Sequence, residues 1–69
     1  MDDLAKIGKR IAELRRARGL TQEDLAGLTE MDRSYLSEIE RGSREGTLST
    51  IKAIAKALAV PLMVLTEGY

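Results

Sequence analysis

Cysteine and histidine are both absent from this chain of 69 residues. Without cysteine there is no disulfide framework and no thiolate chemistry, and without histidine the usual zinc ligand sets are missing as well. The sequence has no glycine-rich phosphate loop, and its paired carboxylates fall on expected solvent faces rather than in a pocket. We therefore expect no metal, no cofactor, no small-molecule ligand and no enzymatic activity.

Long hydrophobic runs are also missing. The longest, residues 57–65, is about half as long as a membrane span, and residues 1–10 lack the apolar core of a signal peptide. We expect a soluble, cytoplasmic protein that makes no membrane contact. A chain of this length has room for one domain, residues 1–69, and its stability is expected to be modest unless packing is efficient or a partner contributes.

Neither sign of charge is in excess, because the net charge is zero. The charges are unevenly placed, however: residues 1–20 carry six bases and three acids, whereas residues 21–46 carry three bases and seven acids. The globally basic surface that drives nonspecific DNA binding is therefore missing. Any contact with DNA must depend on a few well-placed bases and on backbone donors.

The sequence does contain helical periodicity, and no segment alternates with period two. In the first segment, apolar residues recur at intervals of three and four after Asp2 and Asp3, and Gly19 supplies the stop. The apolar positions of this segment are Leu4, Ile7, Ile11 and Leu14. This pattern predicts an amphipathic first helix.

Four shorter helices are expected to follow. Their start signals are Thr21, with Asp24 completing a capping box, then Asp32, Thr47 and Pro61, and the third and fifth helices end at Gly42 and near Thr66. The residues expected to be buried are Leu25, Ala26, Leu36 and Ile39 in the second and third helices, and Leu48, Ile51, Ile54, Ala55 and Leu58 in the fourth. The fold class is therefore all-α, with five helices in one compact unit.

The second and third helices are joined by only about three residues, 29–31, so they must cross steeply, as in a helix-turn-helix at about residues 21–42. The stretches GLTQEDLAGLTEMDRSYLSEIERG and TLSTIKAIAKALAV resemble the DNA-binding domain of the lambda-repressor and Cro-like (XRE) regulators, from Ile7 to Leu65. Within that family, DRSYLSEIERGSREGTLSTI looks closest to controller proteins of restriction-modification systems. The resemblance implies a transcriptional regulator that binds a palindromic operator in duplex DNA as a homodimer.

The resemblance also implies that the third helix, residues 32–41, enters the major groove with its outward N-terminal residues against base edges. Those residues are Arg33, Ser34, Ser37 and Glu38. Arg33 has the geometry to fork onto guanine O6 and N7, and Glu38 can accept from cytosine N4. The alternative for these side chains is a solvated charged face.

Phosphate contacts are expected at the rim of that helix. The resemblance places one at the N-terminus of the second helix, with the side chain of Gln22. The other candidates are Tyr35, Arg41, Ser43 and Arg44. Three alternatives remain open: Gln22 as a residue that merely suits a cap, Tyr35 packed on a neighbouring helix, and Arg44 paired with Glu45 or Glu40.

Two acids of residues 28–42 are interpreted as architectural. Asp32 serves as the helix cap, and the family pairs the acid matching Glu40 with a base on the first helix, which falls here on Arg15. We therefore expect a partly buried structural ion pair between Arg15 and Glu40. The basic run at 15–18 is interpreted as a solvated helix end.

Three positions depart from the family pattern. Glu30 and Ala59 stand where the family usually has glycine, and Gly46 stands where it usually has proline. If the backbone is left-handed at Glu30 and Ala59, each side chain costs about 1 to 2 kcal/mol. The turn geometry, and with it the orientation of the third helix, depends on how these positions are accommodated.

The C-terminal segment suggests how two copies meet. Met63 and Val64 fall where the family usually has polar residues, and exposed apolar neighbours indicate an interface. We expect a dimerisation region at about residues 60–69, the alternative being that both side chains fold back onto the first helix. A different class of function is also open, a protein-interaction module on the same fold, such as an antitoxin or a dimerising adaptor.

Overall fold

The computed structural model describes residues 3–67, so Asp2 and the last two residues of the expected dimerisation region lie outside the described residues. Five helices follow one another: α1 (Asp3–Ala17), α2 (Gln22–Leu28), α3 (Arg33–Arg41), α4 (Leu48–Ala57) and α5 (Leu62–Thr66). Residues 3–67 contain no strand, which confirms the all-α expectation. No helix in this part of the chain has the length and apolar character needed to cross a bilayer.

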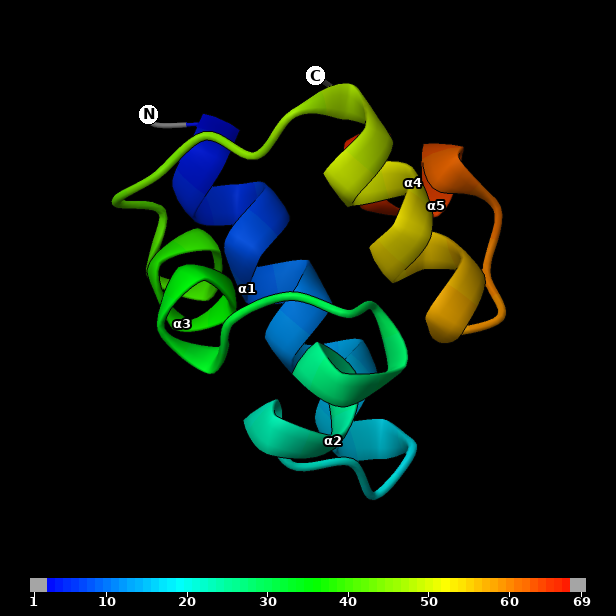
Figure 1. Ribbon diagram of the computed structural model, residues 1–69. Coiled ribbons are helices and arrows are strands. Elements are labelled where there is room, and N and C mark those ends of the chain that lie inside the picture. Colours follow the sequence, from blue (N-terminus) through cyan, green and yellow to red (C-terminus); the bar gives the residue numbers. More distant parts are fainter. Residues whose placement is uncertain (1–2, 68–69) are drawn as a thin grey trace.

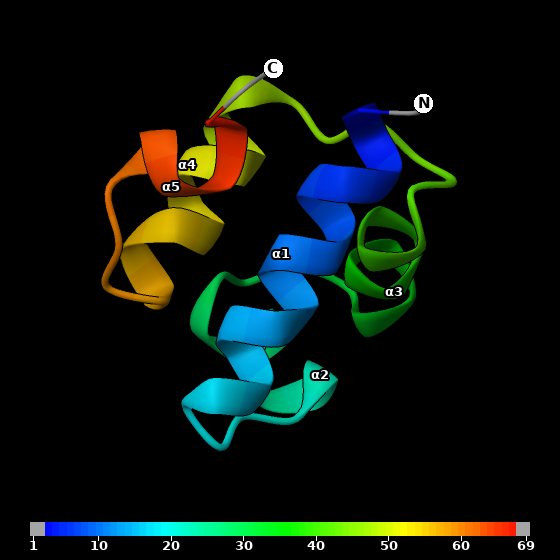
Figure 2. The same cartoon turned by 180° about the vertical axis from the view of Figure 1, so that it is seen from behind.

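The first helix is the support on which the others are placed. It runs through the centre of the molecule, with α3 on one side and α4 with α5 on the other (Figure 1). The view from behind shows α1 in front, between the same two groups (Figure 2). Helix α1 contacts α3 and α5, and α2 contacts α3 and α4, so α3 is held by both α1 and α2.

Capping side chains fix where the short helices begin. Thr21 and Asp24 form the full capping box at α2, with N–H···O distances of 2.9 and 3.0 Å. Asp32 accepts from the backbone N–H of Ser34 at 3.2 Å at the start of α3. Thr47 caps α4 in the same way. Three of the predicted helix starts are therefore confirmed.

Two details of the helix starts differ from expectation. Asp3 lies inside the first turn of α1 rather than before it, where a carboxylate still favours the positive end of the helix dipole. Pro61 stands at the residue before α5 and makes no side-chain cap, whereas the sequence suggested a place within the first turn. Both shifts are by a single residue and leave the helix order unchanged.

Four helices end in a shared motif, in which a residue one or two positions after the end of the helix adopts a left-handed backbone. These residues are Gly19, Glu30, Gly42 and Ala59, with φ values of 70°, 55°, 75° and 59°. After α4, for example, the N–H groups of Ala59 and Val60 donate to the carbonyls of Lys56 and Ala55, each at 3.0 Å. Glu30 and Ala59 are therefore left-handed with a side chain attached, which makes the expected conformational cost of about 1 to 2 kcal/mol applicable to each.

The core lies where α1 meets the remaining helices. Its fully buried side chains are Ile11, Leu25, Leu36, Ile54, Leu58 and Leu65. One expected member is wrong: Leu48 is 66% exposed. It has the helical spacing of the buried stripe, but it is the first residue of α4 and is not packed among the core side chains.

Glycine allows α1 and α3 to approach closely. A Cβ on Gly8, in the middle of α1, would collide with the backbone carbonyls of Ile39 and Glu40. Gly42, left-handed at the end of α3, has the backbone of Ala5 directly against it, where a Cβ would lie 2.7 Å from the Ala5 Cα. Backbone contacts at these two points therefore set the distance and position of α3 relative to α1.

Candidate nucleic-acid interface

The outward face of α3 is polar, and its back is buried. Leu36 and Ile39 enter the core. On the opposite side, a shallow hollow is lined by Arg33, Ser34, Ser37, Glu38 and Arg41. The four residues expected to contact bases are therefore together on one surface, and Arg41, expected at phosphate, lies beside them.

The N-terminus of α2 borders this surface. Gln22 and Arg33 line a second open hollow together with Arg15 and residues 20, 21 and 23. Arg33 Nη1 lies 3.5 Å from Gln22 Oε1, at the outer limit of a hydrogen bond. Arg33 is exposed and belongs to both hollows, so it stands at the junction of α2 and α3.

The buried carboxylate of Glu40 joins α3 to α1. Glu40 accepts from Arg15 Nε at 2.8 Å and from Arg15 Nη2 at 3.1 Å, and the two side chains are only 5% and 9% exposed. The hydrogen bond from Arg15 to Glu40 raises the pKa of Arg15. The structure thus contains the ion pair expected between these residues.

Sequence reasoning missed a third member of this network. Gln22 Nε2 donates to Glu40 Oε1 at 2.9 Å, and Arg15 Nη1 donates to the carbonyl of Leu20 at 2.9 Å. Residues 22 and 40 are too far apart in sequence for spacing to indicate this contact. Gln22 therefore has a structural bond as well as its place near the expected phosphate site.

Arg44 has a different partner from those considered. Its Nε donates to Glu38 Oε1 at 2.6 Å, rather than to Glu45 or Glu40. This bond raises the pKa of Arg44. The same guanidinium lies over the ring of Tyr35, 5.5 Å from its centroid, within the range of a cation–π contact.

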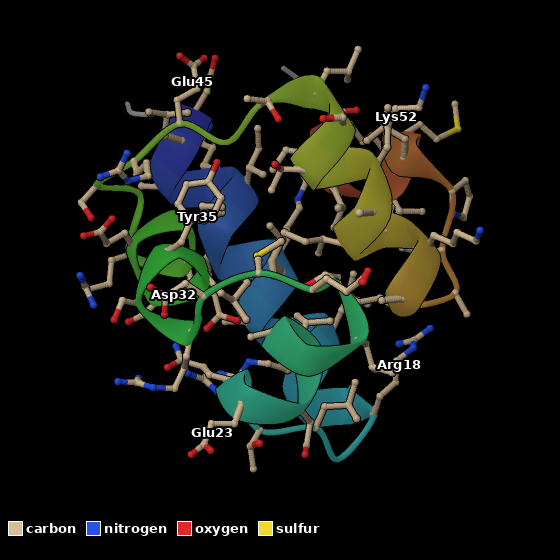
Figure 3. All side chains as sticks on the ribbon, viewed as in Figure 1. Arg18, Glu23, Asp32, Tyr35, Glu45 and Lys52 are labelled. Atoms are coloured by element: carbon tan, nitrogen blue, oxygen red, sulfur yellow. The ribbon has the colours of Figure 1, made fainter. Side chains whose placement is uncertain are left out.

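Tyr35 is half-buried and packs against the core, as its structural alternative anticipated. In Figure 3 its ring points from α3 toward the connection between α3 and α4. The remaining rim residues are also engaged: Arg41 Nη1 donates to Ser37 Oγ at 2.6 Å, and Ser43 Oγ donates to the carbonyl of Glu38 at 3.2 Å. Apart from Gln22, the residues expected to contact phosphate lie on α3 or within three residues of its end.

The fifth helix lies away from this surface and has one exposed apolar side chain. Met63 is 69% exposed. Val64 is half-buried and lines a hollow between α5 and α1 with Leu14 and Ala17, so the expectation of two exposed neighbours is wrong for Val64. Arg10 Nη1, not anticipated, donates to the carbonyl of Glu67 at 2.8 Å and so ties the end of α5 to α1.

Comparisons with known proteins agree with this geometry. The family model described as Helix-turn-helix matches residues 11–65. The uncharacterized HTH-type transcriptional regulator y4dJ of Sinorhizobium fredii is 42% identical over 60 residues, which are 87% of this chain and 78% of the relative. Some curated relatives are longer, and the chain spans 49% and 38% of two of them.

Solved structures share both the fold and the sequence pattern. The restriction-modification controller protein C.AhdI from Aeromonas hydrophila is 46% identical with a TM-score of 0.90, over 94% of this chain and 98% of that one. The controller protein C.Esp1396I, solved as a tetramer in complex with its natural 35 base-pair operator, is 40% identical with a TM-score of 0.85, over 97% and 88% of the two chains.

Proposed function

Since the chain belongs to the Helix-turn-helix family, together with transcriptional regulators and restriction-modification controller proteins, we propose that it is a DNA-binding transcriptional regulator that reads its operator with α3. Its similarity to C.AhdI along nearly the whole of that protein favours a controller protein within the family. Activity of this kind requires a helix that can enter the major groove and side chains that distinguish bases.

The observation that carries the proposal is the polar hollow on α3. A helix fits the major groove, and this one offers two guanidinium groups, two hydroxyls and a carboxylate on one face. Arg33 supplies a fork for guanine, Glu38 an acceptor for cytosine N4, and Ser34 and Ser37 adaptable hydroxyls. Because the back of α3 is fixed by the core and by Glu40, this face meets DNA in one orientation.

Phosphate contacts flank the same helix in the proposal. Gln22 Nε2 carries a second N–H beyond the one directed to Glu40, and it lies in the first turn of α2. The other proposed phosphate contacts lie on α3 or within three residues of its end, and they are Tyr35, Arg41, Ser43 and Arg44. Contacts of this kind fix the register of the protein on the duplex without distinguishing its sequence.

The proposed working form is a twofold dimer joined through α5. Exposed Met63 is the apolar anchor, and Val64 extends it toward the hollow beside α1. A twofold dimer places two recognition helices about 34 Å apart, one turn of B-DNA, on a palindromic operator. An isologous patch near the twofold axis is what such symmetry requires.

Selection from random duplexes at low salt tests the proposal, followed by affinity measurements on the enriched duplex at increasing salt. We expect enrichment of a sequence with twofold symmetry and a steep loss of affinity with salt, as phosphate contacts require. No retention on any duplex at low salt would contradict the proposal and favour the protein-interaction module.

A further inference from the structure

The connection after α3 folds back toward the outward face of α3, the polar surface proposed to contact bases. The N–H of Gly42 donates to the carbonyl of Ile39, and the N–H of Ser43 donates to that of Glu38, each at 3.0 Å. The left-handed backbone of Gly42 against Ala5 makes this reversal possible. Arg44, two residues beyond Gly42, is thereby brought beside a side chain of the preceding helix.

The side chain reached by Arg44 is Glu38, and two contacts hold the guanidinium there. Nε donates to Glu38 Oε1 at 2.6 Å, and the guanidinium carbon lies over the Tyr35 ring, 5.5 Å from its centroid. Tyr35 is itself packed against the core, which restricts where its ring can lie. The guanidinium is thus held by an ion pair on one side and an aromatic ring on the other.

Each member of the ion pair keeps unused hydrogen-bonding capacity. A guanidinium has five N–H donors, of which Arg44 directs the one on Nε to Glu38. Within residues 3–67, no hydrogen bond is made by the two Nη groups of Arg44 or by Oε2 of Glu38. Both residues are partly exposed, with side chains 55% and 36% accessible.

We propose that Arg44 is a positioning residue that makes Glu38 a reader of cytosine. Its Nη groups contact a phosphate while its Nε holds Oε1 of Glu38, and this leaves Oε2 to accept from cytosine N4. The inference rests on the proposed DNA-binding function and deepens it, because it links a phosphate contact to the recognition of one base.

Electrostatics explain why the acid needs this partner. A carboxylate entering the groove alone would be repelled by the surrounding phosphates, whereas one paired with an arginine brings no net charge. Lysine has the same charge but only a point-like ammonium, so it cannot engage a carboxylate through Nε and a phosphate through Nη in a fixed plane. Replacement of Arg44 by lysine therefore separates positioning from simple attraction.

The test is selection from random duplexes by the full chain and three variants, Arg44→Lys, Glu38→Ala and the control Arg41→Lys. Arg41 is a matched control because it lies on the same rim but bonds to Ser37 rather than to a carboxylate. Salt dependence and melting temperature are measured for each protein. We expect Arg44→Lys to lower the preference for cytosine at one base pair per half-site about tenfold, with salt dependence and melting temperature little changed.

Glu38→Ala removes the acceptor and should remove the same preference, and adding Arg44→Lys to it should then change nothing further at that base pair. Arg41→Lys should keep the preference. Equal weakening of Arg44→Lys on all sequences, with the cytosine preference intact, would overturn the positioning role and leave the proposed function standing. A wild-type protein that enriches no sequence would overturn both. An enriched site that is unchanged by Glu38→Ala would overturn this inference and the assignment of Glu38 to cytosine, and would leave DNA binding through α3 standing.

Discussion

The side-chain amide of Gln22 donates to Glu40 Oε1 at 2.9 Å, which ties the first turn of α2 to the last turn of α3. The same oxygen accepts from Arg15 Nη2 at 3.1 Å. One buried carboxylate therefore joins α1, α2 and α3 at the place where the recognition helix is held. Truncating this carboxylate should disturb both the stability of the fold and the orientation of α3.

Arg15→Ala and Glu40→Ala are each expected to destabilise the protein strongly, because each strands a buried charge. Loss of one partner of a buried pair typically costs about 3 to 5 kcal/mol, and Gln22 and the Leu20 carbonyl should soften this here. The double variant is expected to be less destabilised than the sum of the single ones. Thermal melts of the four proteins measure the coupling.

Arg16→Ala is the control for that cycle. Arg16 is exposed, is adjacent to Arg15 on α1, and forms no salt bridge within residues 3–67. Its truncation should change stability by no more than about 0.5 kcal/mol. Strict additivity of the Arg15 and Glu40 variants would show that the pair is not energetically coupled.

Arg33→Ala is expected to relax base preference at one position in each half-site. A bidentate contact with guanine is worth about 1 to 3 kcal/mol of discrimination, and Arg33 is exposed at the junction of α2 and α3. Affinities for the selected operator and for versions altered at each base pair provide the measurement. Equal weakening on every duplex would assign Arg33 to phosphate instead.

Gln22→Ala should show the opposite pattern, a similar loss of affinity on all duplexes. The reason is its place in the first turn of α2, with one amide N–H beyond the bond to Glu40. Gln22→Glu keeps the size of the side chain but places a second carboxylate against Glu40. It should therefore weaken both folding and DNA binding more than Gln22→Ala does. A sequence-selective effect of Gln22→Ala would assign it to the orientation of Arg33, whose Nη1 is 3.5 Å away.

Helix boundaries were predictable because they depend on local chemistry. Thr21, Asp32 and Thr47 act through bonds to backbone two or three residues away, and Gly42 acts through its own backbone angle. Such signals are contained in a few consecutive residues. Burial was less predictable where a helix begins, because periodicity assigns Leu48 a face but does not say whether another element covers that face.

The grouping of the proposed base-contact residues on one face of α3 was predictable, whereas the bonds that their side chains make were not. The resemblance identified Glu38 and Arg44 but not their ion pair, which depends on how the chain reverses after Gly42. The bond between Gln22 and Glu40 likewise requires the crossing of two helices to be known at atomic detail. Local propensity carries no information about contacts of this kind, because they are set by tertiary placement.

Glu30→Gly and Ala59→Gly are each expected to stabilise the protein by about 0.5 to 1 kcal/mol. Both residues have a left-handed backbone, which costs a side-chain-bearing residue about 1 to 2 kcal/mol, and part of the gain is offset by the freedom of glycine in the unfolded chain. Gly42→Ala, at the same place in the motif after α3, should destabilise. Chemical denaturation of the three variants measures the differences, and destabilisation by both glycine substitutions would contradict the strain.

Met63→Glu is expected to convert the proposed dimer to a monomer at micromolar concentration. Met63 is 69% exposed, so a carboxylate there costs the monomer little. Near a twofold axis it would meet its own copy, and the repulsion should weaken association about tenfold or more. Val64 is less suitable for this test because it also packs beside α1, where a charge would disturb the single chain.

Leu28→Glu is the matched control for the dimer, because Leu28 is similarly exposed at 61% but lies on α2, which does not belong to the proposed interface. Sedimentation of the wild type and both variants should give a dimer, a monomer for Met63→Glu and a dimer for Leu28→Glu. If the wild type and Met63→Glu sediment alike, whether as monomers or as dimers, Met63 is not at the interface. Because leucine has nearly the volume and the apolar character of methionine, Met63→Leu should retain the dimer, which separates the loss of apolar contact from the loss of methionine itself.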